Sequence, residues 1–222
     1  MKKWDYILFD LDGTITDSRE GITNCIKYAL REMGRPIPEE EVLLRFIGPP
    51  LVQGFEENIG MNQEDAVQAT AKYRERYHDI GLFEADVYEG VDAVFSYLKE
   101  QGVKIALATS KPEEFAVRIL EHFHLAQYFD VMAGATLDGE RNTKEAVIRE
   151  SLRRLCVTDD KKEKVLMIGD RKYDILGAKS CGIAALGVYY GFAEEGELEE
   201  AGALTTVQTT GQLLDYFRTL AE

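Results

Sequence analysis

The sequence lacks long hydrophobic stretches. No window of the chain approaches the roughly 18 consecutive apolar residues that a membrane-spanning helix needs. At the N-terminus, Met1-Lys2-Lys3 is followed by Trp4-Asp5 and a short apolar run, which is too brief for the hydrophobic region of a secretory signal peptide. We therefore predict a soluble protein of the cytoplasm.

Cysteine and basic charge are also scarce. The three cysteines, Cys25, Cys156 and Cys181, are widely separated and form no C-x-x-C pair, which argues against both a disulfide framework and a zinc site. The formal net charge of -14 argues against binding to a nucleic acid polymer or an anionic membrane, because either would need a basic face. An anionic substrate would require local positive charge that overcomes this acidic field.

Short apolar runs alternate with helical patterns along most of the chain. The runs that we expect to form strands are 6–9, 103–108, 131–133, 165–168 and 183–188. Strands that alternate with helices indicate a parallel sheet with helices on both faces. We therefore predict an α/β fold whose Rossmann-like core is formed by residues 1–16 and 85–222.

Residues 17–84 interrupt this alternation. Apolar residues recur at helical spacing at Ile22, Ile26 and Leu30 and again between 66 and 77, and no strand pattern is convincing there. We expect an all-helical cap domain inserted after the first strand. Because open α/β sheets bind ligands at the carboxyl ends of their strands, this insertion point would place the cap over the site.

Polar residues cluster in four places, three of them directly after predicted strands. The clusters are FDLDGT at 9–14, ATSKP at 108–112, NTK at 142–144 and GDRKYD at 169–174. A parallel sheet brings the carboxyl ends of its strands to one edge, so we expect these clusters to converge.

The residue types in these clusters favour phosphate chemistry with a magnesium ion. The candidate carboxylates are Asp10, Asp12, Asp170 and Asp174. Mg²⁺ takes one or two carboxylates, keeps several waters and binds substrate phosphate. Lys144 would help to neutralise that phosphate, and the Thr109 hydroxyl could donate to one of its oxygens. One carboxylate free to attack phosphorus and a second placed to move a proton support an aspartyl-phosphate route.

As a set and in this order, the four clusters resemble the four motifs of the haloacid dehalogenase superfamily over nearly the full chain. The helical insertion resembles the first type of cap in that superfamily. The resemblance implies that Asp10 is the nucleophile and a metal ligand, while Asp12 is the general acid/base and offers its backbone carbonyl to the metal. True dehalogenases lack the second aspartate, so Asp12 favours a phosphatase.

The resemblance also implies roles for residues outside the first motif. Thr109 and Lys144 would hold the transferring phosphate, with Ser110 beside them. Asp170 would bind the metal and Asp174 would orient the metal shell. From the cap, where family members place a loop that selects the substrate, Arg45 and the Gly48-Pro49-Pro50 turn would face the site.

Three stretches resemble the phosphoglycolate phosphatase-like branch and, within it, bacterial proteins described as similar to 5'-nucleotidases. They are FIGPP at 46–50, ATSKP at 108–112 and LDGERNTK at 137–144. In phosphoglycolate phosphatases a proline usually follows the third-motif lysine, whereas Glu145 follows Lys144, which weakens that assignment more than the phosphatase assignment. We predict hydrolysis of nucleoside 5'-monophosphates, with phosphoglycolate or a small sugar phosphate as the alternative.

Several alternatives stay open from the sequence. Lys111 competes with Lys144 for the phosphate, and Asp174 could merely cap or salt-bridge its own helix. A phosphomutase would need cap cations for a second phosphate, which Arg45 alone does not settle. A non-catalytic protein that binds a phosphorylated ligand would have no need for Asp12. The expected partner is a small phosphorylated metabolite, and the protein would be a monomer or a homodimer.

Overall fold

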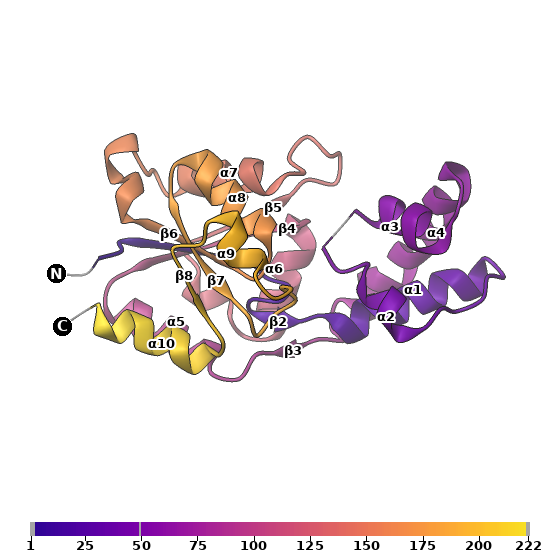
Figure 1. The fold of residues 1–222 in the computed structure, drawn as a ribbon, viewed down its shortest axis with the longest axis horizontal. Helices are drawn as coiled ribbons and strands as arrows, with labels where there is room; N and C mark the ends of the chain where they lie inside the picture. Colours follow the sequence, from indigo (N-terminus) through magenta and orange to yellow (C-terminus); the bar gives the residue numbers. More distant parts are fainter. Residues whose placement is uncertain (1–2, 49, 221–222) are drawn as a thin grey trace. The chain divides into compact units, whose positions relative to one another are not determined.

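The computed structural model describes residues 3–48 and 50–220 (Figure 1). The chain groups into two compact units, one built from the residues up to Asp17 and from Val87 onward, the other from Ser18–Asp86. We call them the sheet unit and the helical unit. Within the described ranges, no helix combines the length and the apolar character that crossing a membrane requires.

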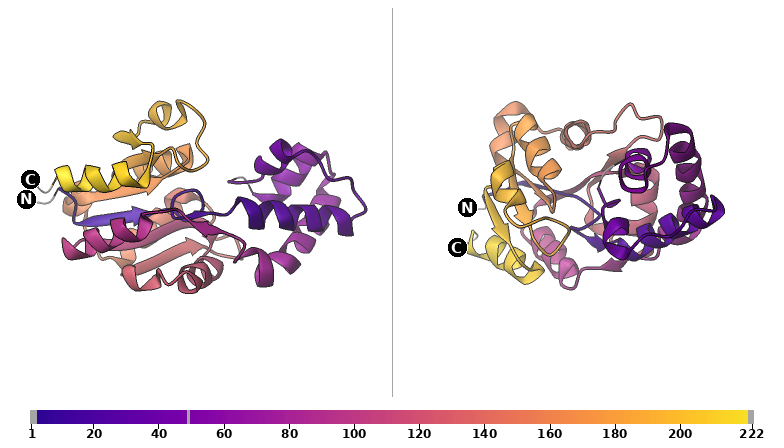
Figure 2. Two further views of the ribbon diagram at one scale, coloured as in Figure 1. Left: turned by 90° about the horizontal axis from the view of Figure 1, so that it is seen from below. Right: turned by 45° about the vertical axis from the view of Figure 1, so that its right-hand side comes forward.

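The described part of the sheet unit contains a six-stranded parallel sheet in the order β5-β4-β1-β6-β7-β8. The strands are β1 (Tyr6–Phe9), β4 (Lys104–Pro112), β5 (Val131–Ala135), β6 (Val165–Gly169), β7 (Ala184–Val188) and β8 (Thr205–Val207). The chain runs outward from β1 to β5 and then returns to β6 on the other side of β1, which lies mid-sheet in the left view of Figure 2. The strand order therefore reverses at β1, where such sheets bind their ligands.

Helices cover both faces of this sheet. Their bounds are α5 (Val91–Glu100), α6 (Glu113–His122), α7 (Lys144–Arg154), α8 (Lys172–Cys181), α9 (Glu197–Ala201) and α10 (Thr210–Thr219). Helices α7 and α8 lie on one face, and α5 and α10 lie on the other (Figure 1). The predicted α/β fold, a parallel sheet covered by helices, is confirmed.

The two faces follow from the alternation of side chains along each strand. Leu8 of β1 joins a buried cluster that includes Val147 of α7 and Ile175 of α8. The next residue, Phe9, points to the opposite face, where its ring meets that of Phe95 in α5 edge-on with centroids 5.0 Å apart. The apolar strands are therefore buried on both sides, as their nearly continuous hydrophobic runs predict.

The helical unit begins with α1 (Arg19–Glu32), whose apolar stripe is buried as its spacing predicts. Further helices are α2 (Glu40–Leu44), α3 (Leu51–Ile59), α4 (Gln63–Arg76) and a π-helical turn (Tyr77–Gly81). At Gly21 of α1 an added Cβ would lie 2.1 Å from the Gly81 carbonyl oxygen, so this close approach requires glycine. Arg76, the last residue of α4, donates two hydrogen bonds to the Glu84 carboxylate, at 2.6 and 2.7 Å, near the C-terminal end of the helical unit.

Some elements differ from the sequence expectation. Strand β4 continues to Pro112 rather than ending near 108, and the short strand β8 was not expected. Helix α3 was also missed, because only a short apolar pattern lies between Pro50 and the left-handed Gly60. Two further short strands, β2 (Thr16–Asp17) and β3 (Asp86–Val87), form a separate two-stranded sheet.

Candidate active site

Three aspartates from two predicted clusters lie together in the sheet unit. One carboxylate oxygen from each of Asp10, Asp170 and Asp174 lies within 4.8 Å of the other two. Strands β1 and β6 are paired in parallel, and the Asp10 backbone N–H donates to the Ile168 carbonyl at 2.9 Å. Asp10 and Asp170 therefore leave the carboxyl edge of the sheet side by side, and the first turn of α8 adds Asp174.

Lys144 lies between two of these carboxylates. Its Nζ is 2.8 Å from Asp10 Oδ1, 2.8 Å from Asp174 Oδ1 and 3.1 Å from the Ala108 carbonyl oxygen. Burial lowers the pKa of Lys144, but the charges of Asp10 and Asp174 outweigh this effect and raise the pKa above its ordinary value. The lysine is therefore a permanent buried cation at the first residue of α7.

The electrostatics of the cluster leave negative charge uncompensated. Burial raises the pKa of Asp170 well above its usual range, and repulsion from Asp174 and Asp10 raises it further. Burial also raises the pKa of Asp174 to about 6, although Lys144 opposes this shift. Buried carboxylates with only hard oxygen donors match the ligand set of a divalent cation such as Mg²⁺. These residues therefore fit a metal site.

Asp12 has a different partner. Strand β1 ends at Phe9, so the two aspartates of the first cluster follow it outside regular strand geometry. The Asp12 Oδ1 atom is 2.7 Å from Lys111 Nζ, and the Asp12 carboxylate does not belong to the cluster of three. Lys111 and Lys144, which the sequence left as alternatives for binding the phosphate, thus contact different aspartates.

The second polar cluster lies on an irregular part of β4. The pairing of β4 with β5 shifts register between Ala108 and Pro112, which re-aims the side chains in between. Thr109 is buried, and its Oγ1 accepts a hydrogen bond from the Lys111 N–H at 3.2 Å. Ser110 is exposed. Thr109 and Lys111 are therefore buried, whereas Ser110 between them is exposed to solvent.

Asp174 also caps its own helix. Its Oδ2 atom accepts from the Arg171 backbone N–H at 3.1 Å, while Oδ1 faces Lys144. At Gly169 an added Cβ would lie 2.1 Å from the Asp174 Cγ atom, so the strand end leaves room for this carboxylate only because residue 169 is glycine. The capping role and the place in the cluster therefore coexist.

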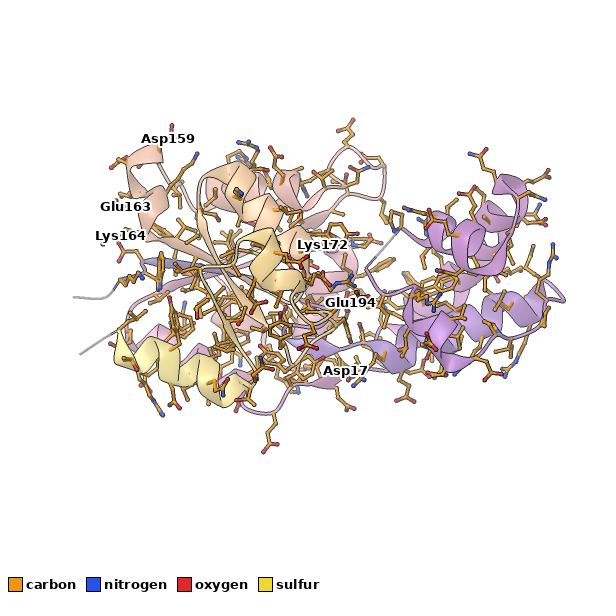
Figure 3. The ribbon with its side chains drawn as sticks, in the orientation of Figure 1. Asp17, Asp159, Glu163, Lys164, Lys172 and Glu194 are labelled. Carbon is orange, nitrogen blue, oxygen red and sulfur yellow. The ribbon has the colours of Figure 1, made fainter. Side chains whose placement is uncertain are left out.

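The start of α8 is held by Glu197 of α9. Its Oε1 atom accepts from Arg171 Nε at 2.9 Å and from the Lys172 N–H at 2.8 Å. Its Oε2 atom accepts from the Glu194 N–H at 3.1 Å. Figure 3 labels Lys172 and Glu194, which belong to the two segments that Glu197 joins. This contact fixes the turn of the chain from which Asp174 projects.

The loop that follows β7 makes contacts at the site that the sequence did not predict. The Phe192 N–H donates to Asp170 Oδ2 at 2.8 Å, and Tyr190 donates its hydroxyl to the Thr14 carbonyl at 3.0 Å. At Gly191 an added Cβ would lie 2.1 Å from the Gly13 carbonyl oxygen. A signal was present, because this loop directly follows the predicted strand 183–188 and shares the carboxyl edge of the sheet.

A second missed feature connects the beginning of α6 with the loop before Lys144. The carboxylate of Glu113 accepts from Arg141 Nη2 at 2.8 Å, from Arg154 at 3.0 Å and from the Gly134 N–H at 3.1 Å. These partners are distant in the sequence, and no local pattern predicts their convergence. The network ties the segment after Lys111 to the segment before Lys144.

Two predicted substrate-binding residues belong to the helical unit. Arg45 is exposed and forms an ion pair with Glu41 at 2.9 Å, and Gly48 has a φ of 107°. Pro49, the next residue of the predicted substrate-selecting turn, lies outside the described residues. The contribution of Arg45 and Gly48 to a substrate site stays a prediction.

Comparison with known proteins identifies the family. The family model for haloacid dehalogenase-like hydrolases matches residues 7–188. A 5'-nucleotidase from Pseudomonas aeruginosa is 43% identical over 196 residues, which cover 88% of this chain and 87% of the relative. A protein named tyrosine-protein kinase PtkA, from Mycobacterium tuberculosis, is 35% identical over 213 residues, which cover 96% of this chain and 70% of the relative.

A solved structure has the same fold over nearly its full length. The crystal structure of a predicted phosphatase from Clostridium acetobutylicum superposes with a TM-score of 0.88 at 42% identity, and it covers 97% of this chain and 99% of that chain. The family match spans all four polar clusters, and these findings support the predicted enzyme class, a phosphatase. The chain therefore belongs to the haloacid dehalogenase-like hydrolases.

Proposed function

We propose that this protein is a Mg²⁺-dependent phosphomonoester hydrolase that acts through an aspartyl-phosphate on Asp10. One observation carries the proposal: three carboxylates cluster at the edge of the sheet where the strand order reverses, and the buried Lys144 contacts two of them. Such a site binds a hard cation and, through it, a phosphate group.

Asp10, Asp170 and Asp174 would hold the metal ion, and the family resemblance adds the backbone carbonyl of Asp12. When bound, Mg²⁺ neutralises negative charge on the carboxylates and on the substrate phosphate. Lys144 contributes a fixed positive charge beside Asp10, at 2.8 Å. Thr109 and Ser110 would donate hydroxyl hydrogen bonds to the phosphate oxygens.

The reaction then takes two steps on this chain's own residues. A carboxylate oxygen of Asp10 forms a bond to phosphorus, the bond from phosphorus to the ester oxygen breaks, and Asp12 gives its proton to the departing oxygen. In the second step Asp12 takes a proton from water, the water oxygen bonds to phosphorus, and the bond to Asp10 breaks. The product is inorganic phosphate, and both aspartates return to their starting state.

We propose that the helical unit, Ser18–Asp86, is the cap domain predicted at 17–84, and that the sheet unit is the catalytic core predicted at 1–16 and 85–222. The cap domain would exclude bulk water and select the leaving group, with Arg45 and Gly48 on the selecting loop. We propose nucleoside 5'-monophosphates as substrates, supported by the relative named 5'-nucleotidase. Phosphoglycolate or a small sugar phosphate is the alternative. The cytoplasmic location and the monomeric or homodimeric state stay predictions from the sequence.

The first test is phosphate release from a panel of nucleoside monophosphates, phosphoglycolate, sugar phosphates and an aryl phosphate, each with Mg²⁺ and with chelator. Chelator-sensitive release that is strongest on nucleotides supports the proposal. Strongest release from phosphoglycolate or a sugar phosphate selects the alternative substrate. No release from any ester at saturating Mg²⁺ favours a phosphomutase or a non-catalytic binding protein.

The covalent step has its own test, with a matched pair of variants. Asp10→Asn should abolish turnover without changing the far-UV circular dichroism spectrum. Asp159→Asn changes the same charge at a side chain that is 95% exposed, labelled in Figure 3, and should keep full turnover. Acid quenching during turnover of a phosphate-labelled substrate should trap label on the unmodified protein. Appreciable turnover by Asp10→Asn, or no trapped label, would remove the aspartyl-phosphate mechanism.

A further inference from the structure

Both carboxylate oxygens of Asp170 are held by neighbouring residues. Oδ1 accepts from the Thr14 hydroxyl at 3.2 Å, and Oδ2 accepts from the Phe192 N–H at 2.8 Å. Asp170 is fully buried, so its orientation depends on these two donors rather than on water. One donor belongs to the turn after β1 and the other to the loop after β7.

Tyr190 joins these two segments. Its hydroxyl donates to the Thr14 carbonyl at 3.0 Å, from a position two residues before Phe192. The ring of Tyr190 is fixed by an edge-to-face contact with Tyr88, with centroids 4.9 Å apart. The hydroxyl is thus aimed by packing and bonds the same residue whose side chain bonds Asp170.

The backbone of both segments is shaped for this close approach. Gly13 has a φ of 81°, and a Cβ there would lie 2.0 Å from Asp170 Oδ2. A Cβ on Gly191 would lie 2.5 Å from the Asp170 Cβ atom. Asp170 is therefore enclosed between two turns whose close approach to its side chain requires glycine at positions 13 and 191.

We propose that Tyr190 is a positioning residue: by tying the Thr14 carbonyl to the loop that carries the Phe192 N–H, it sets the orientation of the Asp170 carboxylate for metal binding. This inference rests on the proposed function, because it takes Asp170 as a metal ligand. Residues that orient ligating carboxylates strongly affect metal affinity although they never touch the metal.

The adjacent tyrosine provides a matched control. Tyr189 donates its hydroxyl to Glu199 and accepts from the Gly196 N–H, contacts that do not reach the cluster. Tyr189→Phe and Tyr190→Phe each remove one hydroxyl at neighbouring positions. Calorimetric titration of the full chain with MgCl₂, without substrate, compares their metal affinities with that of the unmodified protein.

We expect Tyr190→Phe to bind Mg²⁺ about threefold to tenfold more weakly, the size of effect expected when one orienting hydrogen bond is lost. The Mg²⁺ concentration for half-maximal turnover should rise by the same factor, while KM for the phosphate ester at saturating Mg²⁺ stays unchanged. Tyr189→Phe should match the unmodified protein in both measurements. An affinity of Tyr190→Phe within twofold of the unmodified protein would overturn the inference.

A double-mutant cycle with Thr14→Val tests the route of the effect. This variant keeps the Thr14 carbonyl and removes the hydroxyl that bonds Asp170. If Tyr190 acts through Thr14, the combined loss of Mg²⁺ affinity will be smaller than the product of the two single losses. If the two losses of Mg²⁺ affinity multiply, Tyr190 does not act through Thr14, and the proposed route is overturned.

Two further outcomes distinguish a failure of this inference from a failure of the proposed function. If the unmodified protein binds no Mg²⁺, the proposed metal site fails and the inference fails with it. If Tyr190→Phe loses resistance to urea but keeps its Mg²⁺ affinity, the hydroxyl only stabilises the fold, and the inference fails while the proposed function stands.

Discussion

Replacing Lys144 by methionine should destabilise the metal-free protein in a pH-dependent manner. The side chain of Lys144 is 5% exposed, and its Nζ forms ion pairs with Asp10 Oδ1 and Asp174 Oδ1, each at 2.8 Å. Methionine keeps the length and removes the charge. Removing one partner of a buried ion pair typically costs about 3–5 kcal/mol of unfolding free energy. We expect a loss of this size at pH 8, which is well above the pKa of about 6 of Asp174.

The loss should be smaller at pH 5. The pKa of Lys144 is raised, so its stabilising charge is fully present below its ordinary pKa and does not vary between pH 5 and pH 8. The pKa of Asp174 is raised by burial to about 6, so most folded molecules carry a proton on this carboxyl at pH 5. A neutral Asp174 no longer needs a cation. The penalty should therefore fall to about half, because only the contact with Asp10 remains.

Urea unfolding followed by circular dichroism in the presence of chelator measures both penalties. Lys111→Met is the matched control, because the Lys111 side chain is also 5% exposed and is 2.7 Å from Asp12. Its partner lies outside the cluster, so its penalty should not follow the protonation of Asp174. Equal penalties for Lys144→Met at pH 5 and pH 8 would refute the reasoning, as would the same pH dependence in Lys111→Met.

Three further predictions concern the metal, the charge network and the first turn. Adding MgCl₂ should raise the Tm more at pH 8 than at pH 5. The reason is that the metal must displace protons from carboxyls such as Asp170, whose pKa is raised. Equal Tm shifts at the two pH values would contradict this prediction. Glu113→Gln should lower the unfolding free energy, measured in urea, by about 1–2 kcal/mol, because Arg141 and Arg154 lose a charged acceptor. The control Glu114→Gln changes an exposed side chain and should alter the unfolding free energy little. Gly13→Ala should abolish Mg²⁺ binding in a calorimetric titration, because its Cβ would lie 2.0 Å from Asp170 Oδ2; an unchanged affinity would show that the turn can relax.

The sheet and the carboxylate cluster could be predicted because their signals are local. Each buried parallel strand is an apolar run, and the residues after such runs must lie at one edge of the sheet. That rule places Asp10 beside Asp170 without knowledge of any side-chain contact.

The partner of Lys111 could not be predicted, because Lys111 lies within the register shift of β4. Apolar patterning ends near Ala108, yet the strand runs on to Pro112 and re-aims the side chains beyond the shift. Contacts between distant segments are equally invisible to a pattern. The hydrogen bond from Tyr190 to Thr14 spans 176 positions, and no periodicity relates these two residues.

The charge of the site explains how an acidic chain could bind an anionic substrate. The whole chain carries a formal net charge of -14, and in the cluster of three carboxylates Lys144 is a compensating cation in contact with Asp10 and Asp174. Lys111 lies 2.7 Å from Asp12, whose carboxylate is outside the cluster of three. Without a metal the cluster would repel a phosphate dianion, whereas a bound divalent cation would cancel the remaining charge of the carboxylates. Metal and phosphate should therefore each strengthen the binding of the other, because binding linkage is reciprocal.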